Sequence, residues 1–292
     1  MVFSLKSKHL ALEPLHFAVI GNPINHSLSP FIHQHFATTT SKIINYQKIL
    51  APSHAFAEIV EHFFGNNGQG LNITLPFKQE AFALADYYSE RAQLAAAVNT
   101  LMIDNHQRLY GDNTDGFGLI CDLETNLLET LQGKNILLIG AGGAARGVIM
   151  PLIEAKPKSL TIVNRTISRV DQIIEQFCYL AKQHNVLLIG GGLQLATRTA
   201  FDIVINATSF GLSNHNCMEF HIKPNGLAYD MMYGPAASIF LNSAKQKGAR
   251  GADGLGMLVE QAAESFLLWH KIKPPTQNTL KALRQFLIDQ SS

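Results

Sequence analysis

Four short segments combine polar side chains with glycine or proline where apolar strands are expected to end. They are residues 22–30 (NPINHSLSP), 72–78 (NITLPFK), 97–100 (AVNT) and 111–118 (GDNTDGFG). Lys78 and Asp115 supply one charge of each sign, and the neutral hydrogen-bonding groups are those of Ser27, Ser29, Thr74 and Asn99. Because α/β folds place ligand contacts at strand ends, this set predicts a site for a polyhydroxylated ligand.

Each of these residues, taken alone, also has an ordinary structural explanation. Ser29 before a proline is typical of a helix N-cap, and Asn99 is typical of a turn. Lys78 fits a solvated first helical turn, and Asp115 fits a helix N-terminus. For any single residue the structural explanation is the better prediction, so the functional hypothesis depends on the combination.

The segment at residues 140–147 (GAGGAARG) has the composition of a phosphate-binding loop. It directly follows the apolar run NILLI at residues 135–139 and opens a predicted helix. A glycine backbone can turn tightly and approach a pyrophosphate, whose charge suits a helix N-terminus. Ala145 is an allowed small residue at the third position of this pattern. We therefore predict a dinucleotide site, with a merely tight strand-to-helix turn as the alternative.

The residues after the next strand indicate which dinucleotide would bind. An NAD site usually carries Asp or Glu there, for the ribose 2′-hydroxyl. This chain has Asn164, Arg165 and Thr166 instead, with Arg169 one turn further on. A guanidinium can bind a 2′-phosphate through two hydrogen bonds, so NADP is predicted. The alternative is that both arginines are solvated charges at a helix start.

The elements that would position these residues alternate between strands and helices. In the first half, strands are expected at 16–21, 45–51, 71–75, 98–104 and 108–110, with helices from Ser29 and Pro76 and at 53–64 and 89–97, and a hairpin turn at 105–106. In the second half, strands are expected at 135–139, 160–163, 202–205 and 229–232, with helices after the first two and at 255–270 and 276–289. The glycine triplet at 190–192 lacks the Lys and Ser/Thr of a P-loop, and a loop or bulge is predicted there.

This alternation predicts an α/β protein of two domains. An N-terminal α/β domain would bind substrate, and a Rossmann-type parallel sheet would bind the dinucleotide. We place the boundaries at residues 1–115 for the substrate-binding and catalytic domain and 116–251 for the NADP-binding domain. The helices of residues 252–292 would complete the first domain.

Composition excludes several other classes of protein. Of 292 residues, 47% are apolar and 15% charged, which favours a large core over disorder, and the net charge of +1 argues against a nucleic-acid binder. No apolar run is long enough to span a membrane, and no signal peptide is evident. Three separated cysteines, Cys121, Cys178 and Cys217, suggest reduced thiols, so a cytoplasmic protein is predicted. The twelve histidines show no metal-ligand spacing, and no metal is predicted.

Taken together, these motifs resemble those of the shikimate dehydrogenase family over nearly the whole chain. After the four segments above come GAGGAARG, NRT at 164–166, NATSFG at 206–211, YDMMY at 229–233 and GADGLGMLVEQAA at 251–263, in the family's order. Phe210 departs from the pattern, filling a position often occupied by a smaller residue. The resemblance implies NADP-dependent reversible reduction of 3-dehydroshikimate to shikimate, in the chorismate and aromatic amino acid pathway, by a cytoplasmic enzyme that could form a homodimer.

The resemblance also implies residue roles. Ser27 and Ser29 would bind the substrate carboxylate, Lys78 would lie at the reacting oxygen, and Lys78 and Asp115 would be catalytic. The hydroxyls would contact Thr74, Asn99, Asp115 and Gln261, with Tyr233 nearby. The cofactor would contact Glu90, Gly140, Ala141, Gly142, Gly143, Ala144, Asn164, Arg165, Thr166, Ile167, Ser168, Arg169, Met231 and Gly254. Independently, Gln261 lies in a mostly apolar helical stripe, where a polar group needs a partner.

Three rival functions remain open at this stage. An NAD-dependent quinate/shikimate enzyme is disfavoured by the Asn164-Arg165-Thr166 sequence. A non-catalytic NADP-responsive binding module is disfavoured by the presence of both Lys78 and Asp115. A folate-type dehydrogenase of similar two-domain shape would turn over a pterin and not shikimate.

Overall fold

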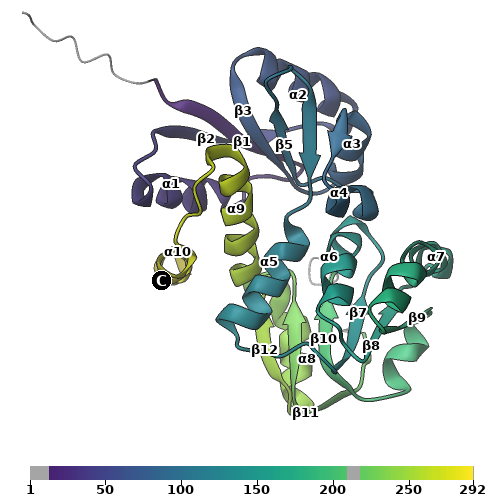
Figure 1. The fold of residues 1–292 in the computed structure, drawn as a ribbon. Helices are drawn as coiled ribbons and strands as arrows, with labels where there is room; N and C mark the ends of the chain where they lie inside the picture. Colours follow the sequence, from purple (N-terminus) through teal and green to yellow (C-terminus); the bar gives the residue numbers. More distant parts are fainter. Residues whose placement is uncertain (1–12, 209–217, 292) are drawn as a thin grey trace, which may run out of the picture.

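The computed structural model describes residues 13–208 and 218–291, and within them the chain forms two β-sheets flanked by helices (Figure 1). The first sheet has the strand order β2-β1-β3-β5-β6-β4. Its strands are β1 (Leu15–Gly21), β2 (Ile44–Leu50), β3 (Gly68–Ile73), β4 (Tyr87–Tyr88), β5 (Thr100–Ile103) and β6 (Leu109–Asp112). Strands β2, β1 and β3 are parallel, whereas β5 and β6 form the predicted antiparallel hairpin.

The second sheet is parallel throughout, with the strand order β12-β11-β10-β7-β8-β9. Its strands are β7 (Asn135–Ile139), β8 (Ser159–Val163), β9 (Leu187–Gly191), β10 (Phe201–Asn206), β11 (Ile222–Asp230) and β12 (Arg250–Asp253). Central strands of such a sheet are covered on both faces, which explains the uninterrupted apolar run of β7. The predicted Rossmann-type architecture is confirmed.

Helices lie on both sides of each sheet and connect the strands. They are α1 (Ser29–Thr39), α2 (Phe56–Gly65), α3 (Lys78–Leu84), α4 (Glu90–Ala95), α5 (Asp115–Cys121), α6 (Gly143–Glu154), α7 (Ile167–Gln183), α8 (Ser238–Gln246), α9 (Leu255–His270) and α10 (Thr276–Ser291). Short 3₁₀ turns occupy Ser53–Ala55, Leu193–Thr197 and Gly234–Ala237, and a π turn occupies Asp122–Asn126. Each sheet has its own buried apolar cluster.

Three local predictions differ from the structure. Ser29 is the first residue of α1, and its N-cap is Leu28, so Ser29 does not cap the helix. Gly190 and Gly191 are not in a loop or bulge but in β9, an edge strand. A Cβ built on Gly190 would lie 2.4 Å from Ile174 Cγ1, so the absence of a side chain lets α7 pack closely on this strand. β12 continues to Asp253, two residues past the boundary placed at Gly251.

Helix α5 joins the two halves of the molecule because two of its glycines permit close helix packing. A Cβ built on Gly116 would lie 2.5 Å from the Gly147 carbonyl of α6, and one built on Gly118 would lie 2.7 Å from the Met257 carbonyl of α9. Larger residues at either position would push a neighbouring helix away. The start of α5 is therefore held at a fixed depth between the cofactor-side helix α6 and the returning helix α9 (Figure 1).

Helix α9 brings the C-terminal part of the chain back to the first sheet. Trp269 Nε1 donates a hydrogen bond to the Leu101 carbonyl at 3.3 Å, and its ring covers β3 at Gly70, where a Cβ would lie 2.4 Å from ring atoms. Ser265 is fully buried against the same sheet. Residues far apart in the chain thus share one site on the side of the first sheet that faces α9.

Candidate active site

Lys78 and Asp115 form an ion pair at the starts of two helices. Lys78 is the first residue of α3 and Asp115 the first of α5, and Lys78 Nζ contacts Asp115 Oδ2. Their side chains are 16% and 6% exposed, so the pair is largely shielded from bulk water. Asn99 Nδ2 donates a hydrogen bond to the other carboxylate oxygen of Asp115 at 2.8 Å. The structure therefore presents one oriented ammonium, still partly accessible, in a polar site.

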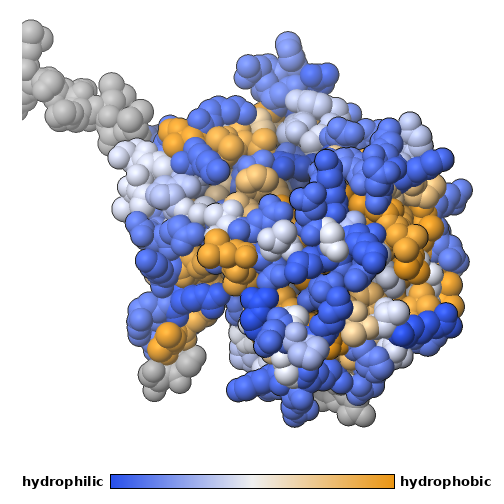
Figure 2. All heavy atoms as spheres, turned by 60° about the horizontal axis from the view of Figure 1, so that its bottom comes forward, coloured by the Kyte–Doolittle hydropathy of each residue, from blue (hydrophilic) through white to orange (hydrophobic). Residues whose placement is uncertain are grey.

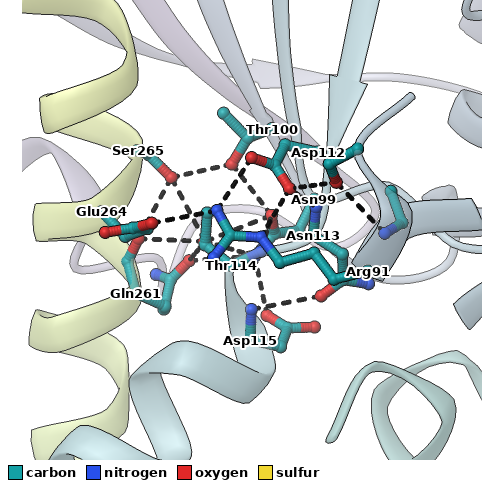
Figure 3. A network of polar contacts seen from close by, with 12 residues as sticks. Arg91, Asn99, Thr100, Asp112, Asn113, Thr114, Asp115, Gln261, Glu264 and Ser265 are labelled. Carbon is teal, nitrogen blue, oxygen red and sulfur yellow. Dashed lines mark hydrogen bonds and ion pairs between the residues drawn. The ribbon is translucent and has the colours of Figure 1, made fainter. Parts of the chain in front are cut away.

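Asn99 is the centre of the surrounding hydrogen-bonded network (Figure 3). Its Nδ2 also lies 2.9 Å from Thr114 Oγ1 and 3.2 Å from Gln261 Oε1. Its Oδ1 accepts hydrogen bonds from the Thr114 main-chain N–H at 2.9 Å and from Thr100 Oγ1 at 2.8 Å. The network holds Asn99, Asp115 and Gln261 together, although Gln261 is 162 positions from Asn99.

A second layer of buried polar residues lies behind this network. Asn72 Nδ2 donates to Ser265 Oγ at 3.0 Å, and Ser265 Oγ lies 2.7 Å from Thr100 Oγ1. Tyr46 Oη donates to Asn72 Oδ1 at 2.7 Å. Burial raises the pKa of Tyr46 well above its usual value, and a hydrogen bond with Ser29 opposes that shift. The contacts thus run continuously from Ser29 to the Lys78–Asp115 pair.

The two serines lie together in the turn between β1 and α1. Ser27 Oγ donates to Ser29 Oγ at 3.3 Å, and the Ser29 main-chain N–H donates to Ser27 Oγ at 3.4 Å. Ser27 is half-buried and Ser29 is buried. Thr74, just after β3, is also half-buried. Tyr233 packs against an apolar cluster formed by side chains of α1, α9 and α10, and burial raises the pKa of its hydroxyl.

A largely buried ion-pair network lies beside these residues, and the sequence analysis did not predict it. Arg91 donates to both oxygens of Asp112, at 2.7 and 2.8 Å, and to Glu264 Oε1 at 3.0 Å. Burial lowers the pKa of Arg91, but the bonds and charges of Asp112 and Glu264 outweigh it, and the net pKa is raised. Asp112 ends β6 and is 2% exposed. Arg91 and Glu264 are 173 positions apart, and no local pattern signals their pairing.

The glycine segment approaches the ion pair directly. Gly140 has φ +119°, a conformation that favours glycine, and exposed Gly142 is the N-cap of α6. A Cβ built on Gly142 would meet nothing within 4 Å, which leaves open space beside the helix N-terminus. A Cβ built on Gly143 would lie 3.9 Å from Lys78 Cβ. The loop expected to hold a pyrophosphate and the candidate catalytic lysine are therefore neighbours.

The other predicted cofactor residues lie along the same edge of the second sheet. Arg165, Thr166, Ile167, Ser168 and Arg169 are exposed after β8, and Asn164 is half-buried. Sequence reasoning gave no role to Arg146 on α6, whose pKa is lowered by burial and by the nearby charge of Arg169. Such a gathering of guanidiniums fits a phosphate-bearing ligand. This region therefore fits the 2′-phosphate of NADP.

Three further predicted cofactor residues lie at three different elements: Met231 follows β11, Gly254 follows β12, and Glu90 begins α4. A Cβ built on Gly254, just after β12, would lie 2.4 Å from the Met231 carbonyl, so these two residues touch. Glu90 is exposed at the start of α4, a helix that packs on α6.

Among the described residues, no group of three His, Cys, Asp or Glu is placed to hold a metal ion. Cys121 and Cys178 are free thiols, while Cys217 and Phe210 lie outside the described residues.

Comparison with known proteins assigns the chain to a family. Three family models match it: "Shikimate dehydrogenase substrate binding domain" at residues 19–101, "Shikimate / quinate 5-dehydrogenase" at 122–214, and "Shikimate 5'-dehydrogenase C-terminal domain" at 254–284. The shikimate dehydrogenase (NADP(+)) of Cupriavidus necator is 47% identical over 277 residues, covering 93% of this chain and 94% of the relative.

Solved structures agree with these matches. An Ael1 enzyme from Pseudomonas putida superposes with a TM-score of 0.83 at 39% identity, covering 92% of this chain and 97% of that one. The shikimate 5-dehydrogenase of Thermus thermophilus, solved with NADP(H) and shikimate, superposes with a TM-score of 0.80 at 31% identity, covering 93% and 99%. The chain belongs to the shikimate dehydrogenase family.

Proposed function

We propose that this protein catalyses the NADP-dependent, reversible reduction of 3-dehydroshikimate to shikimate. The observation that carries the proposal is the position of the Lys78–Asp115 ion pair against the glycine loop. A Cβ built on Gly143 would lie 3.9 Å from Lys78 Cβ, so a cofactor held by the loop would lie close to Lys78. The family membership supports the same activity.

Lys78 would act on the oxygen of the ring ketone. When bound, NADPH supplies a hydride to the carbonyl carbon, and negative charge develops on the oxygen. The Lys78 ammonium can stabilise that charge and deliver a proton to it. Asp115, held by Asn99 at 2.8 Å, orients the ammonium toward the site. In the reverse direction the same lysine receives the hydroxyl proton.

The remaining substrate contacts follow from the polar layout. Ser27 and Ser29 can donate hydroxyl hydrogen bonds to the substrate carboxylate without adding charge. Asn99, Asp115 and Gln261 already form one network and would exchange part of it for ring hydroxyls. Thr74 and Tyr233 complete the set that we assign to the substrate.

The remaining cofactor contacts divide along the second sheet. Gly140, Ala141, Gly142, Gly143 and Ala144 would hold the pyrophosphate. The run from Asn164 to Arg169 would hold the 2′-phosphate, and Met231 and Gly254 would line the nicotinamide half. Glu90 is assigned to the cofactor only by the family resemblance. These roles accompany the proposed division into a substrate domain of residues 1–115 and 252–292 and a cofactor domain of residues 116–251, except that the end of β12, up to Asp253, belongs to the second sheet.

A side-by-side assay tests the function. Reduction of NADP⁺ and NAD⁺ is followed with shikimate and with quinate at equal concentrations, with a pterin substrate as a further comparison. We expect turnover of shikimate with NADP⁺ and much less with NAD⁺ or quinate. Preferred use of quinate with NAD⁺, or turnover of the pterin alone, would contradict the proposal. Binding of NADP⁺ without any turnover would favour a non-catalytic module.

Location and self-association are also proposals. Among the described residues no helix is both long and apolar enough to cross a membrane. On the face drawn in Figure 2, hydrophobic residues lie in separate patches among hydrophilic ones. We propose a cytoplasmic protein that forms a homodimer. Light scattering during size-exclusion chromatography would give the mass, and cell fractionation would give the location.

A further inference from the structure

A buried carboxylate without a cationic partner lies at the edge of the second sheet where the cofactor is proposed to bind. Asp230 is the last residue of β11 and is 1% exposed. Its Oδ2 accepts a hydrogen bond from Asn206 Nδ2 at 3.0 Å, and its Oδ1 accepts one from the Met232 main-chain N–H at 2.9 Å. Among the described residues, no Lys, Arg or His forms an ion pair with it. The proposed mechanism does not use this group.

The sheet order places Asp230 under the nicotinamide half of the cofactor. The glycine loop follows β7, the arginine-bearing segment follows β8 on one side of it, and β10 and β11 lie on the other side. A dinucleotide lies across the carboxyl ends of such strands, with its pyrophosphate at the glycine loop. If the 2′-phosphate is held after β8, the nicotinamide would lie over β10 and β11. Asn206 and Asp230 are the last residues of those two strands.

Contacts from Asp230 reach the glycine loop through Asn206. Asn206 Oδ1 accepts hydrogen bonds from Thr208 Oγ1 at 2.6 Å and from the Thr208 main-chain N–H at 3.2 Å. The Thr208 methyl group would lie 3.1 Å from a Cβ built on Gly140. The oxygen of the Asn206 amide thus holds Thr208, the residue that touches Gly140, the first glycine of the loop.

Contacts from Asp230 also position Met231 and Gly254. The Met231 main-chain N–H donates to the Asn206 carbonyl at 2.9 Å, and the Met232 N–H is held by Asp230 itself. The Gly254 N–H donates to the Met232 carbonyl at 2.9 Å. One carboxylate therefore helps to fix the ends of three neighbouring strands, β10, β11 and β12.

Both groups that hold Asp230 are donors, so the geometry suits the ionised form. The Asn206 amide cannot turn its oxygen toward Asp230 without losing both bonds from Thr208. A protonated Asp230 would present one O–H to a donor and lose one of its two bonds. Burial raises the pKa of Asp230 to about 6, the bonds from Asn206 and Met232 oppose that shift, and the charge of Asp253 adds to it. Asp253 faces Asp230 from β12 and is itself 3.4 Å from Arg284 Nη2.

The direction of this pKa shift means that the ionised form of Asp230 does not stabilise the folded protein. Its pKa in the folded protein is above the usual value of 3.8, so the folded state binds the proton more tightly than the unfolded state. The ionised carboxylate therefore lowers stability above about pH 6. A group that is kept ionised against stability is typical of a functional site.

We propose that ionised Asp230 is a positioning residue for the nicotinamide half of the cofactor site, so that NADP(H) binds more weakly when Asp230 is protonated. The inference rests on the proposed NADP-dependent function. Asp230 acts through Asn206, Thr208 and Met231 rather than by touching the substrate.

Cofactor binding measured against pH tests this inference. The dissociation constants of NADP⁺ and of 2′-phospho-ADP-ribose are measured by calorimetry from about pH 7.5 to about pH 5. The 2′-phosphate also titrates near pH 6, but both ligands carry it together with the pyrophosphate, and only NADP⁺ carries the nicotinamide. If binding needs the ionised carboxylate, a pKa of about 6 predicts that NADP⁺ binding weakens about 10-fold more than 2′-phospho-ADP-ribose binding at pH 5.

Two variants localise the effect. In Asp230→Asn the new amide places a donor against Asn206, so we expect NADP⁺ binding at pH 7.5 to weaken on the order of 10-fold and to lose the extra pH dependence. The matched control is Asp202→Asn, which removes a partly exposed carboxylate from the opposite end of the Asn206 strand, where it binds Asn135 and Lys223. That variant should keep the binding curve of the parent protein.

The outcomes are distinguishable. Parallel pH profiles for NADP⁺ and 2′-phospho-ADP-ribose in the parent protein would overturn the inference, even if Asp230→Asn did not fold. A lower melting temperature of Asp230→Asn with unchanged NADP⁺ binding would also overturn it. Absence of NADP⁺ binding at every pH would instead refute the proposed function.

Discussion

The buried ion pair between Arg91 and Asp112 offers the sharpest test of how the active site is held. Arg91→Met keeps the length and apolar stem of the side chain but removes two bonds, of 2.7 and 2.8 Å, from a carboxylate that is 2% exposed. Removing one partner of a buried pair destabilises a protein by about 3–5 kcal/mol. The Arg91 side chain is 23% exposed, so we expect the lower end, about 3 kcal/mol.

The same chain contains a matched exposed pair. Arg108 donates from Nε and Nη2 to Asp104 Oδ2, but its side chain is 55% exposed, and such surface pairs contribute about 0–1 kcal/mol. At about 2–4 °C per kcal/mol, Arg91→Met should lower the melting temperature by about 6–12 °C and Arg108→Met by at most about 4 °C. Calorimetry measures both.

A double variant separates lost charge pairing from lost packing. Asp112→Asn added to Arg91→Met removes the unpaired buried charge and should recover part of the loss. An Arg91→Met protein that melts no lower than Arg108→Met would refute the reasoning. It would mean that water or another group already compensates Asp112.

Three further predictions concern the site residues and the core. Lys78→Met should lower kcat for shikimate oxidation by about 10²- to 10⁴-fold with little change in shikimate KM, and near-normal kcat in a folded variant would remove Lys78 from catalysis. Arg165→Ala should raise KM for NADP⁺ by about 10- to 150-fold and leave NAD⁺ kinetics little changed, because one charge-assisted contact of about 1.5–3 kcal/mol is lost; an unchanged ratio of the two cofactors would contradict this. Burial and the charge of His270 lower the pKa of fully buried His33 to about 3, so its contribution to stability is complete above pH 6.5 and is lost as pH falls toward 3. His270 and Asp230 also titrate in this range, so the test compares two proteins. In urea unfolding, the change in stability from pH 7 to about pH 4.5 should be about 2–3 kcal/mol less unfavourable in His33→Phe than in the parent protein, and equal changes in the two would contradict this.

Sequence reasoning located the elements with strong local signals. The bounds predicted for β7 and α9 match the structure because an unbroken apolar run and a continuous helical stripe are both local patterns. Gly190 and Gly191 were misplaced because a glycine run looks like a loop in sequence, whereas here Gly190 makes room in a strand for Ile174 and Val170 of α7. Ser29 was misplaced because Ser before Pro fits both an N-cap and a first helical residue.

The residues that support the candidate site could not be predicted from local sequence patterns. Arg91, Asp112 and Glu264 each look like solvated charges in their own segments, and only the fold brings them together. The same holds for Asn72 and Ser265, which are 193 positions apart and bond at 3.0 Å. Motifs predicted the candidate ligand-binding groups, whereas the groups that hold them are determined by long-range packing.

The return of α9 to the first sheet has a consequence for biosynthesis. Asn99, Thr100 and Thr114 depend on Gln261 and Ser265 for hydrogen bonds, and Arg91 depends on Glu264. At roughly 5–20 residues per second, a ribosome needs roughly 8–30 s to travel from β6 to the end of that contact region. During this interval the nascent first sheet has all its strands, but its polar centre lacks its partners, and the entire second sheet is made before α9 can dock. The substrate site is therefore among the last parts of the molecule to be completed, after the site for the cofactor.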